Sequence, residues 1–257
     1  MLVVLGLAGL LVVVAPVGAL LVRAGWGSLL TEVAKPAVTQ ALWLSLRTAA
    51  TTTLVALVLG VPLAWLLARD VLPFTHLLRA LVTLPMVLPP VVGGVALLAL
   101  LGRRGVLGQH LDVWFGVTIP FSTAAVVIAQ TFVALPFLVV SVDGALRSRG
   151  TRAEDVAATL GASQWYAFRR VTLPAVAPAV LSGAVLCFAR ALGEFGATIT
   201  FAGNFPGVTR TMPSAIYLTM QSSPQAAVAL SVVLVAVAAV VLVALRSRWL
   251  TGLGSVR

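Results

Sequence analysis

The sequence EDVAATLGASQWYAFRRVTLP runs from Glu154 to Pro174 and lies between two long apolar runs. Its first half carries charged and small residues at helical spacing, and its second half carries Trp165, Tyr166 and Phe168. Large apolar groups are unusual in a segment that the sequence places in water. Two short helices with an aromatic face are suited to a groove on another protein, so this stretch predicts a docking surface for a soluble partner.

The composition places the rest of the chain in a membrane. The 257 residues are 60% hydrophobic and 9% charged, and the mean hydropathy is +1.10, whereas a soluble domain carries roughly a quarter charged residues. About 20 helical residues cross the 30 Å of hydrocarbon in a bilayer. We therefore predict an all-α integral membrane protein with about six transmembrane helices, whose cores lie near residues 2–22, 46–68, 80–101, 121–142, 173–195 and 225–245.

These apolar runs are continuous, whereas the strands of a membrane barrel would alternate over about ten residues. We expect one transmembrane domain over residues 1–257, with a core at 41–245 and a polar loop at 143–174.

An N-terminal apolar stretch can also be a cleaved signal peptide. This one lacks a basic n-region and exceeds the usual apolar length, so we expect a retained helix.

Lys and Arg residues accumulate in the cytoplasmic loops of membrane proteins. A cytoplasmic N-terminus places ten of the 17 Lys and Arg residues on the cytoplasmic side, including Arg246, Arg248 and Arg257, and five of the ten lie in the loop between the fourth and fifth helices. This loop is the firmest cytoplasmic assignment. The net charge of +10 is therefore explained by the membrane topology and by attraction to anionic headgroups. It gives no reason to expect nucleic-acid binding.

The loop has clear helix signals. Thr151 and Glu154 have the spacing of a capping box, which predicts a helix start with reciprocal hydrogen bonds between these two residues. Gly161 can supply the left-handed conformation that ends this helix. Ser163 can cap a second short helix, from Gln164 to Arg170, and Pro174 marks the entry to the fifth span. The aromatic residues alone fit either a docking face or an interfacial membrane anchor.

The spacing of the loop favours docking. Asp155-Val156-Ala157, three residues, Gly161, nine residues and Val171-Thr172-Leu173-Pro174 resemble the EAA signature of ABC-importer permeases. Asp155 stands where that family most often has Glu, Val156 where it has Ala and Val171 where it has Ile. The resemblance implies the type I importer permease fold and a coupling loop that contacts a cytoplasmic ATPase subunit. The implied coupling residues are Glu154, Asp155, Ala157, Gly161, Trp165, Phe168, Leu173 and Pro174.

Further stretches narrow the family. GEFGATITFAGNFPGVT (193–209), LPMVLPPVVGGVALLALLGRRGVLG (84–108) and ALWLSLRTA (41–49) resemble molybdate permease subunits. Sulfate and thiosulfate permease subunits share the layout, so a sulfate, thiosulfate or tungstate importer is the alternative. The resemblance implies a homodimer, two copies of the ATPase subunit, which bind ATP and Mg²⁺, and an external molybdate-binding protein. This chain itself would hold no cofactor or metal and would not be an enzyme.

Two groups of residues are candidates for the gate. Arg190 and Glu194 are four residues apart near the outer end of the fifth helix, so they can form an ion pair or, alternatively, contact the transported anion. Pro85, Pro89 and Pro90 should kink or break the third span, either to form a gate or as a packing kink. Gly196 is a further candidate, because it belongs with Gly193, Gly203 and Gly207 to a glycine-rich segment that can line a cavity.

Two other classes of function fit less well. An intramembrane hydrolase needs a nucleophile with a base, or a metal set, within the membrane. His76 and His110 lie in or beside loops, and the sequence has no His-Glu-x-x-His motif. An ATP-independent anion transporter often shows an inverted repeat, which we do not find, and would leave the coupling loop unexplained.

Overall fold

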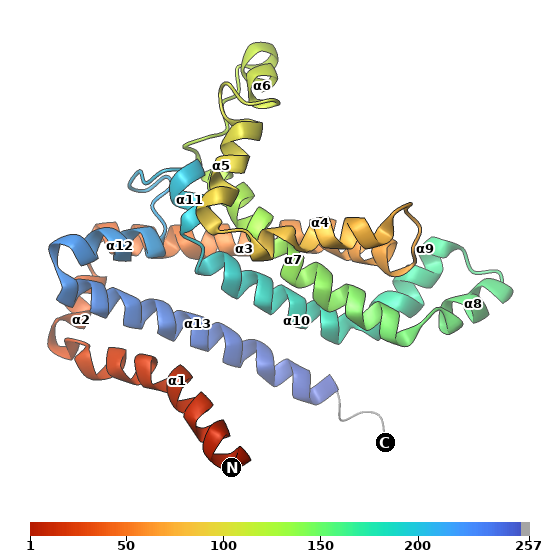
Figure 1. The fold of residues 1–257 in the computed structure, drawn as a ribbon, viewed down its shortest axis with the longest axis horizontal. Coiled ribbons are helices and arrows are strands. Elements are labelled where there is room, and N and C mark those ends of the chain that lie inside the picture. The colour runs from red at the N-terminus through yellow and green to blue at the C-terminus, as the bar shows by residue number, and fades with distance from the viewer. Residues whose placement is uncertain (253–257) are drawn as a thin grey trace.

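The computed structural model describes residues 1–252, and it describes their side chains except at 28, 242 and 244–252. Arg257 therefore lies outside the described residues, and the side chains of Arg246 and Arg248 are not described. The described chain folds into helices without strands (Figure 1). The helices are α1 (Leu2–Arg23), α2 (Trp26–Val33), α3 (Pro36–Ala68), α4 (Thr75–Val87), α5 (Pro90–Leu101), α6 (Gly108–Phe115), α7 (Thr123–Arg149), α8 (Arg152–Thr159), α9 (Gln164–Ala167), a π-helical turn η1 (Phe168–Thr172), α10 (Leu173–Leu192), α11 (Gly196–Phe201), α12 (Met212–Ser222) and α13 (Pro224–Gly252).

The prediction of about six spans is confirmed. Over the described residues, five helical segments are long and apolar enough to cross a membrane: α1, α3, α7, the continuous segment Gln164–Leu192, and α13. A sixth span is formed if α4 and α5 are counted as one broken helix. Helix α7 continues to Arg149, so the first part of the predicted loop 143–174 is the end of this helix.

The main core lies where α3, α7 and α10 pack side by side. Small residues permit this close packing: a Cβ atom at Gly183 of α10 would lie 3.0 Å from the Cα atom of Leu138 in α7. Ala56 and Ala64 of α3 are fully buried in the same core. Helix α1 has no buried residue in its apolar window and lies along α13, outside this core (Figure 1).

The third span is broken, as its prolines predict. The helix axis bends by 116° between α4 and α5, and Leu88 and Pro89 between them have extended backbone angles. Pro89 and Pro90 have no N–H to continue the hydrogen bonds of α4. The predicted span at 80–101 is therefore formed by two helices, and α5 with α6 projects sideways from the bundle (Figure 1).

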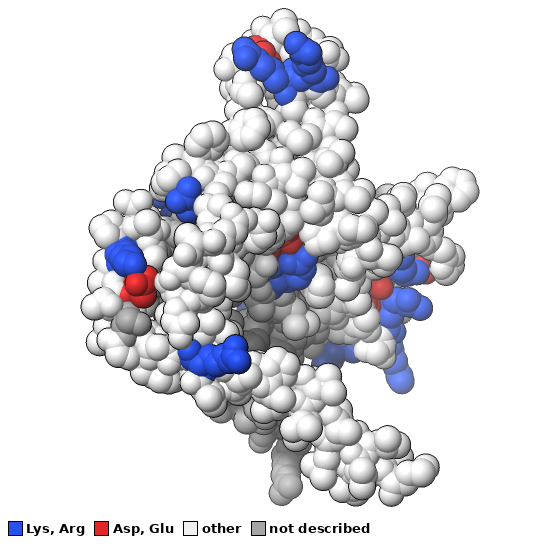
Figure 2. All heavy atoms as spheres, turned by 60° about the vertical axis from the view of Figure 1, so that its left-hand side comes forward, with Lys and Arg blue, Asp and Glu red and all other residues white. Residues whose placement is uncertain are grey.

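The surface agrees with a membrane location. Figure 2 shows a wide uncharged surface in which Lys, Arg, Asp and Glu occur as a few separate groups. One group lies on the arm formed by α5 and α6, where Arg103 Nε is 3.0 Å from Asp112 Oδ2. The hydrogen bonds from Arg103 and Thr118 hold the pKa of Asp112 below its ordinary value, so this carboxylate stays charged.

Candidate functional site

The predicted coupling loop lies at one end of the bundle, and α2 and α12 lie at the opposite end (Figure 1). Helix α8 begins directly after Thr151, as predicted. It ends before Gly161, which has a φ of +82° and therefore the predicted left-handed conformation. The Ser163 hydroxyl accepts the N–H of Tyr166 at 3.3 Å, so the predicted N-cap of the second helix is also present.

The predicted capping box is wrong. The Thr151 hydroxyl donates to Asp155 Oδ2 at 2.8 Å and makes no cap hydrogen bond. Glu154 instead turns toward the bundle and accepts hydrogen bonds from Arg69 and Thr172. A carboxylate gains more from a bidentate guanidinium and a hydroxyl than from one backbone N–H, which explains why it leaves the capping position.

The second helix does not end at Arg170. It continues from α9 through η1 into α10, and the Leu173 N–H donates to the Phe168 carbonyl across the wider π-helical turn. In a regular α-helix the Pro174 ring would clash with the Arg170 carbonyl. The π-helical turn before α10 relieves this clash. Pro174 lies in the first turn of α10, as predicted, although the helical segment Gln164–Leu192 runs through this point without a break. Leu173 packs against the core and Pro174 is exposed.

The aromatic residues of the loop divide into two groups. Trp165 and Tyr166 are 67% and 57% exposed, and Val156 and Leu160 of α8 are also exposed. Phe168 is half-buried: its ring packs edge-on against Trp65 of α3, with centroids 6.1 Å apart. Phe168 therefore joins the loop to α3, whereas Trp165, which stacks on Phe168, remains available to a partner or to lipid headgroups.

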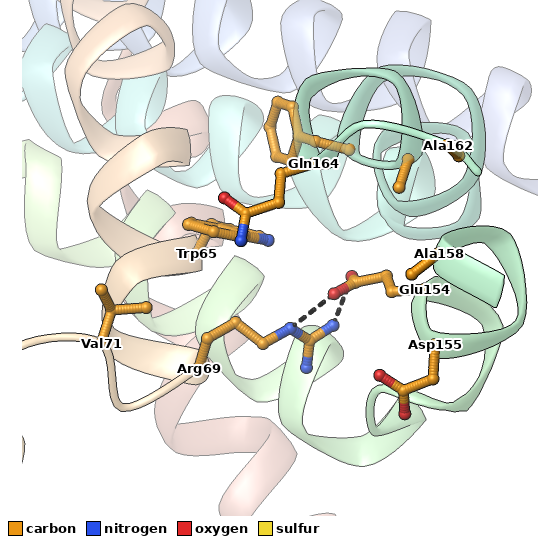
Figure 3. A pocket seen from close by; sticks show the side chains of 10 residues that line it. Trp65, Arg69, Val71, Glu154, Asp155, Ala158, Ala162 and Gln164 are labelled. Atoms are coloured by element: carbon orange, nitrogen blue, oxygen red, sulfur yellow. Dashed lines mark hydrogen bonds and ion pairs between the residues drawn. The ribbon is translucent and has the colours of Figure 1, made fainter.

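A cavity of about 270 Å³ separates the loop from the end of α3 (Figure 3). Trp65 and Arg69 line it from α3, and Glu154, Asp155 and Gln164 line it from the loop. Ala157 of α8 is half-buried. Within the cavity, the two nitrogens of Arg69 point at the two oxygens of Glu154 (Figure 3).

At the opposite end of the bundle, the predicted pair of Arg190 and Glu194 is present. Arg190 Nη1 lies 2.6 Å from Glu194 Oε2, and the Glu194 side chain is 1% exposed. The other carboxylate oxygen accepts the N–H of Ala197 at 2.8 Å, which satisfies a free amide in the first turn of α11. The buried Glu194 carboxylate thus pairs with a partly exposed arginine and caps the next helix.

The gate candidates meet at the contact between α5 and α11. A Cβ atom at Gly196 would lie 2.6 Å from the Cβ atom of Pro90, so only glycine permits this approach. Pro89 precedes the contact at the bend, and Pro85 lies within α4 before the bend. The structure therefore brings Pro90, Gly196 and the pair of Arg190 and Glu194 into one region.

The comparisons with known proteins identify the family. Residues 56–252 match the model of the binding-protein-dependent transport system inner membrane component family. The chain belongs to this family of transport permeases. Its members are membrane components of transport systems and not enzymes, as the sequence predicts. The molybdenum transport system permease protein ModB of Mycobacterium bovis is 51% identical over 242 residues, 94% of this chain and 91% of that protein.

Other relatives agree with this assignment. The ModB protein of Escherichia coli K12 is 43% identical and covers 82% of this chain and 92% of its own length. A probable sulfate transport system permease protein of Zygnema circumcarinatum is 37% identical over 77% of this chain and 69% of that protein. A solved bacterial alginate ABC transporter has a chain with a TM-score of 0.76 at 17% identity, covering 95% of this permease and 91% of that chain. The predicted importer permease fold is therefore confirmed.

Sequence reasoning missed several residues of this permease. Arg69 and Thr172, the partners of Glu154, lie far from it in sequence, and only the charge of Arg69 at the end of a span could have drawn attention to it. Within the core, the Thr52 hydroxyl donates to Gln130 Oε1 at 3.1 Å.

Among the residues whose placement is described, no group of three or more His, Cys, Asp or Glu side chains could hold a metal ion.

Proposed function

We propose that this permease carries molybdate into the cell and is driven by ATP that a separate cytoplasmic subunit hydrolyses. The observation that carries the proposal is the 51% identity to a molybdenum transport permease over 94% of the chain. The predicted coupling loop adds support, because it exposes the apolar side chains of Val156, Leu160 and Trp165 at one end of the bundle. A cleft in an ATPase subunit would cover such a surface.

The proposal includes a defined assembly. Two copies of this chain would enclose the pathway, with one ATPase subunit under each copy and a molybdate-binding protein outside. The ATPase subunits would bind the ATP and Mg²⁺. The N-terminus would face the cytoplasm, because α1 ends and α13 begins at the end of the bundle opposite α8 (Figure 1). With α8 in the cytoplasm, the start of α1 points to the same side.

The pairing of charges is consistent with transport of an anion that must be released. Arg190, at the proposed gate, is neutralised by Glu194 at 2.6 Å. Without this partner, the partly buried Arg190 would hold an oxyanion more strongly, because the attraction of opposite charges increases as the dielectric constant falls. A neutralised arginine leaves selection of the anion to the external binding protein. The contact of Pro90 with Gly196 would then open and close the pathway.

Sulfate, thiosulfate or tungstate import is the second candidate, supported by the 37% identical sulfate permease relative. These oxyanions would use the same fold and the same coupling loop. The experiment that separates molybdate import from sulfate import is ATP-driven uptake of labelled molybdate by proteoliposomes that contain the permease, its ATPase and its binding protein. Uptake that persists in excess unlabelled sulfate is the expected result. Uptake abolished by sulfate would assign the permease to the sulfate branch.

A further inference from the structure

Glu154 lies at the junction of three helical segments. Its carboxylate receives two hydrogen bonds from Arg69, Nε to Oε2 at 3.0 Å and Nη2 to Oε1 at 2.5 Å, and a third from the Thr172 hydroxyl at 2.5 Å. Arg69 follows the last residue of α3, Thr172 closes η1 before α10, and Glu154 lies in the first turn of α8. One side chain of the coupling loop is therefore bound to two membrane helices.

The environment makes this junction rigid. The side chains of Arg69 and Glu154 are 10% and 20% exposed, and Thr172 is 5% exposed, so water screens the charges only weakly. A bidentate guanidinium and carboxylate pair also fixes the relative orientation of its partners. Among the ion pairs of the described residues, this pair alone connects α8 to another helix.

The packing around the junction is open on both sides. The cavity of about 270 Å³ in Figure 3 lies on one side of the pair, and a cavity of about 150 Å³ lies on the other, lined by Leu146, Ala153 and Val176. Arg69 and Glu154 line both cavities. Because side chains do not fill the space between α8 and α3 there, the pair provides the direct connection from α8 to α3, beside the indirect contact of Phe168 with Trp65.

The neighbouring acidic residue has a different environment. Asp155 is exposed and bonds Thr151 within its own loop, on the part of α8 where Val156 is also exposed. Helix α8 thus has an outward surface available to a partner and one inward carboxylate fixed to the bundle. Glu154, which the family resemblance places among the coupling residues, is largely unavailable for contact with a partner.

We propose that Glu154 transmits movement of α8 to α3 and α10, and that Arg69 and Thr172 are positioning residues for this transmission. The inference rests on the proposed function, because it needs ATP hydrolysis by a partner to move α8. When α8 is displaced, the bidentate pair pulls the end of α3 and the hydroxyl pulls the start of α10, so both membrane helices move together.

The test measures molybdate transported per ATP hydrolysed in proteoliposomes of the complete transporter. Arg69→Ala should lower this ratio roughly tenfold, within the usual range of coupling between sites, while ATP hydrolysis continues. Thr172→Val should lower it less, and Thr172→Ser should retain the wild-type ratio because the hydroxyl remains. Arg23→Ala is the charge-matched control, since Arg23 is an exposed arginine at the end of α1.

A swapped pair guards against misfolding as the explanation. Arg69→Glu combined with Glu154→Arg should recover much of the ratio that either single change loses. A wild-type ratio in both Arg69→Ala and Thr172→Val, or no recovery in the swap, would overturn the inference. Failure of the proposed function gives a different result, because the wild-type transporter itself would then take up no molybdate with ATP.

Discussion

The permease has two pairs of arginine and glutamate at opposite ends of one continuous helix, Gln164–Leu192. The pair of Arg190 and Glu194 is formed by residues four apart, and Glu194 is 1% exposed. The pair of Arg69 and Glu154 joins residues 85 apart, and Glu154 is 20% exposed. The first connects α10 to α11 beside the proposed gate, whereas the second connects α3 and α10 to the coupling loop.

The difference shows that a contact between residues close in the sequence can be predicted, whereas a contact between residues far apart cannot. A pair at a spacing of four can be derived from helical geometry, so the sequence predicts the pair of Arg190 and Glu194. A pair that closes a loop of 85 residues exists only because the fold brings α3 beside α8. The two pairs should also fail differently: loss of the buried local pair should reduce stability, and loss of the long-range pair should reduce coupling.

The largest expected effect is on the buried pair. Arg190→Ala leaves the charged Glu194 carboxylate buried without its partner, which should cost about 3–5 kcal/mol of stability. The apparent free energy of unfolding in mild detergent measures this cost. The double variant with Glu194→Ala should recover part of it, because no charge is then left unpaired. Purely additive losses would show that the two side chains do not act as a pair.

A smaller effect is expected at the contact between α5 and α11. Gly196→Ala places a methyl group 2.6 Å from Pro90 Cβ, and such overpacking should cost about 1–3 kcal/mol. Gly193→Ala is the matched control, because its Cβ atom would meet only Ala189 O, at an ordinary 3.6 Å. Thermal unfolding of both variants checks the difference. Equal midpoints would mean that α5 and α11 do not pack this closely.

The smallest effect is expected at the turn of the coupling loop. Gly161 has open space around its Cβ position but a φ of +82°, so a substitution acts through backbone strain alone. Gly161→Val should cost about 1–2 kcal/mol locally and lower molybdate transported per ATP, whereas Gly161→Asn should change little. Uptake and ATP hydrolysis are measured on the same vesicles. A wild-type ratio for Gly161→Val would separate this turn from coupling.

Most of the fold follows from the sequence, because hydrophobic length alone sets the spans of α1, α3, α7 and α13. The local signals also succeed where one residue decides the backbone, as at Gly161 and Ser163. Pro89 and Pro90 predict the break in the third span, although not its angle of 116°. That angle depends on the packing of α5 against α11, which no local pattern encodes.

The wrong predictions occur where a local sequence signal is weaker than the structure around it. Thr151 and Glu154 have the spacing of a capping box, but a tertiary partner, Arg69, offers Glu154 a stronger interaction than the local amide. The predicted end of the second loop helix at Arg170 is wrong because the π-helical turn Phe168–Thr172 carries the helix on into α10. Helices α2, α6, α11 and α12 are short, so they have no long apolar period from which they could be predicted.

The ATP requirement of molybdate uptake tests the central claim most directly. Proteoliposomes with the permease, its ATPase and its binding protein are given labelled molybdate outside, with ATP and Mg²⁺ or ADP and Mg²⁺ on the ATPase side. We expect accumulation above the external concentration with ATP and none with ADP. Equal uptake with both nucleotides would contradict the account, because the permease would then move the anion without ATP hydrolysis by the partner subunit.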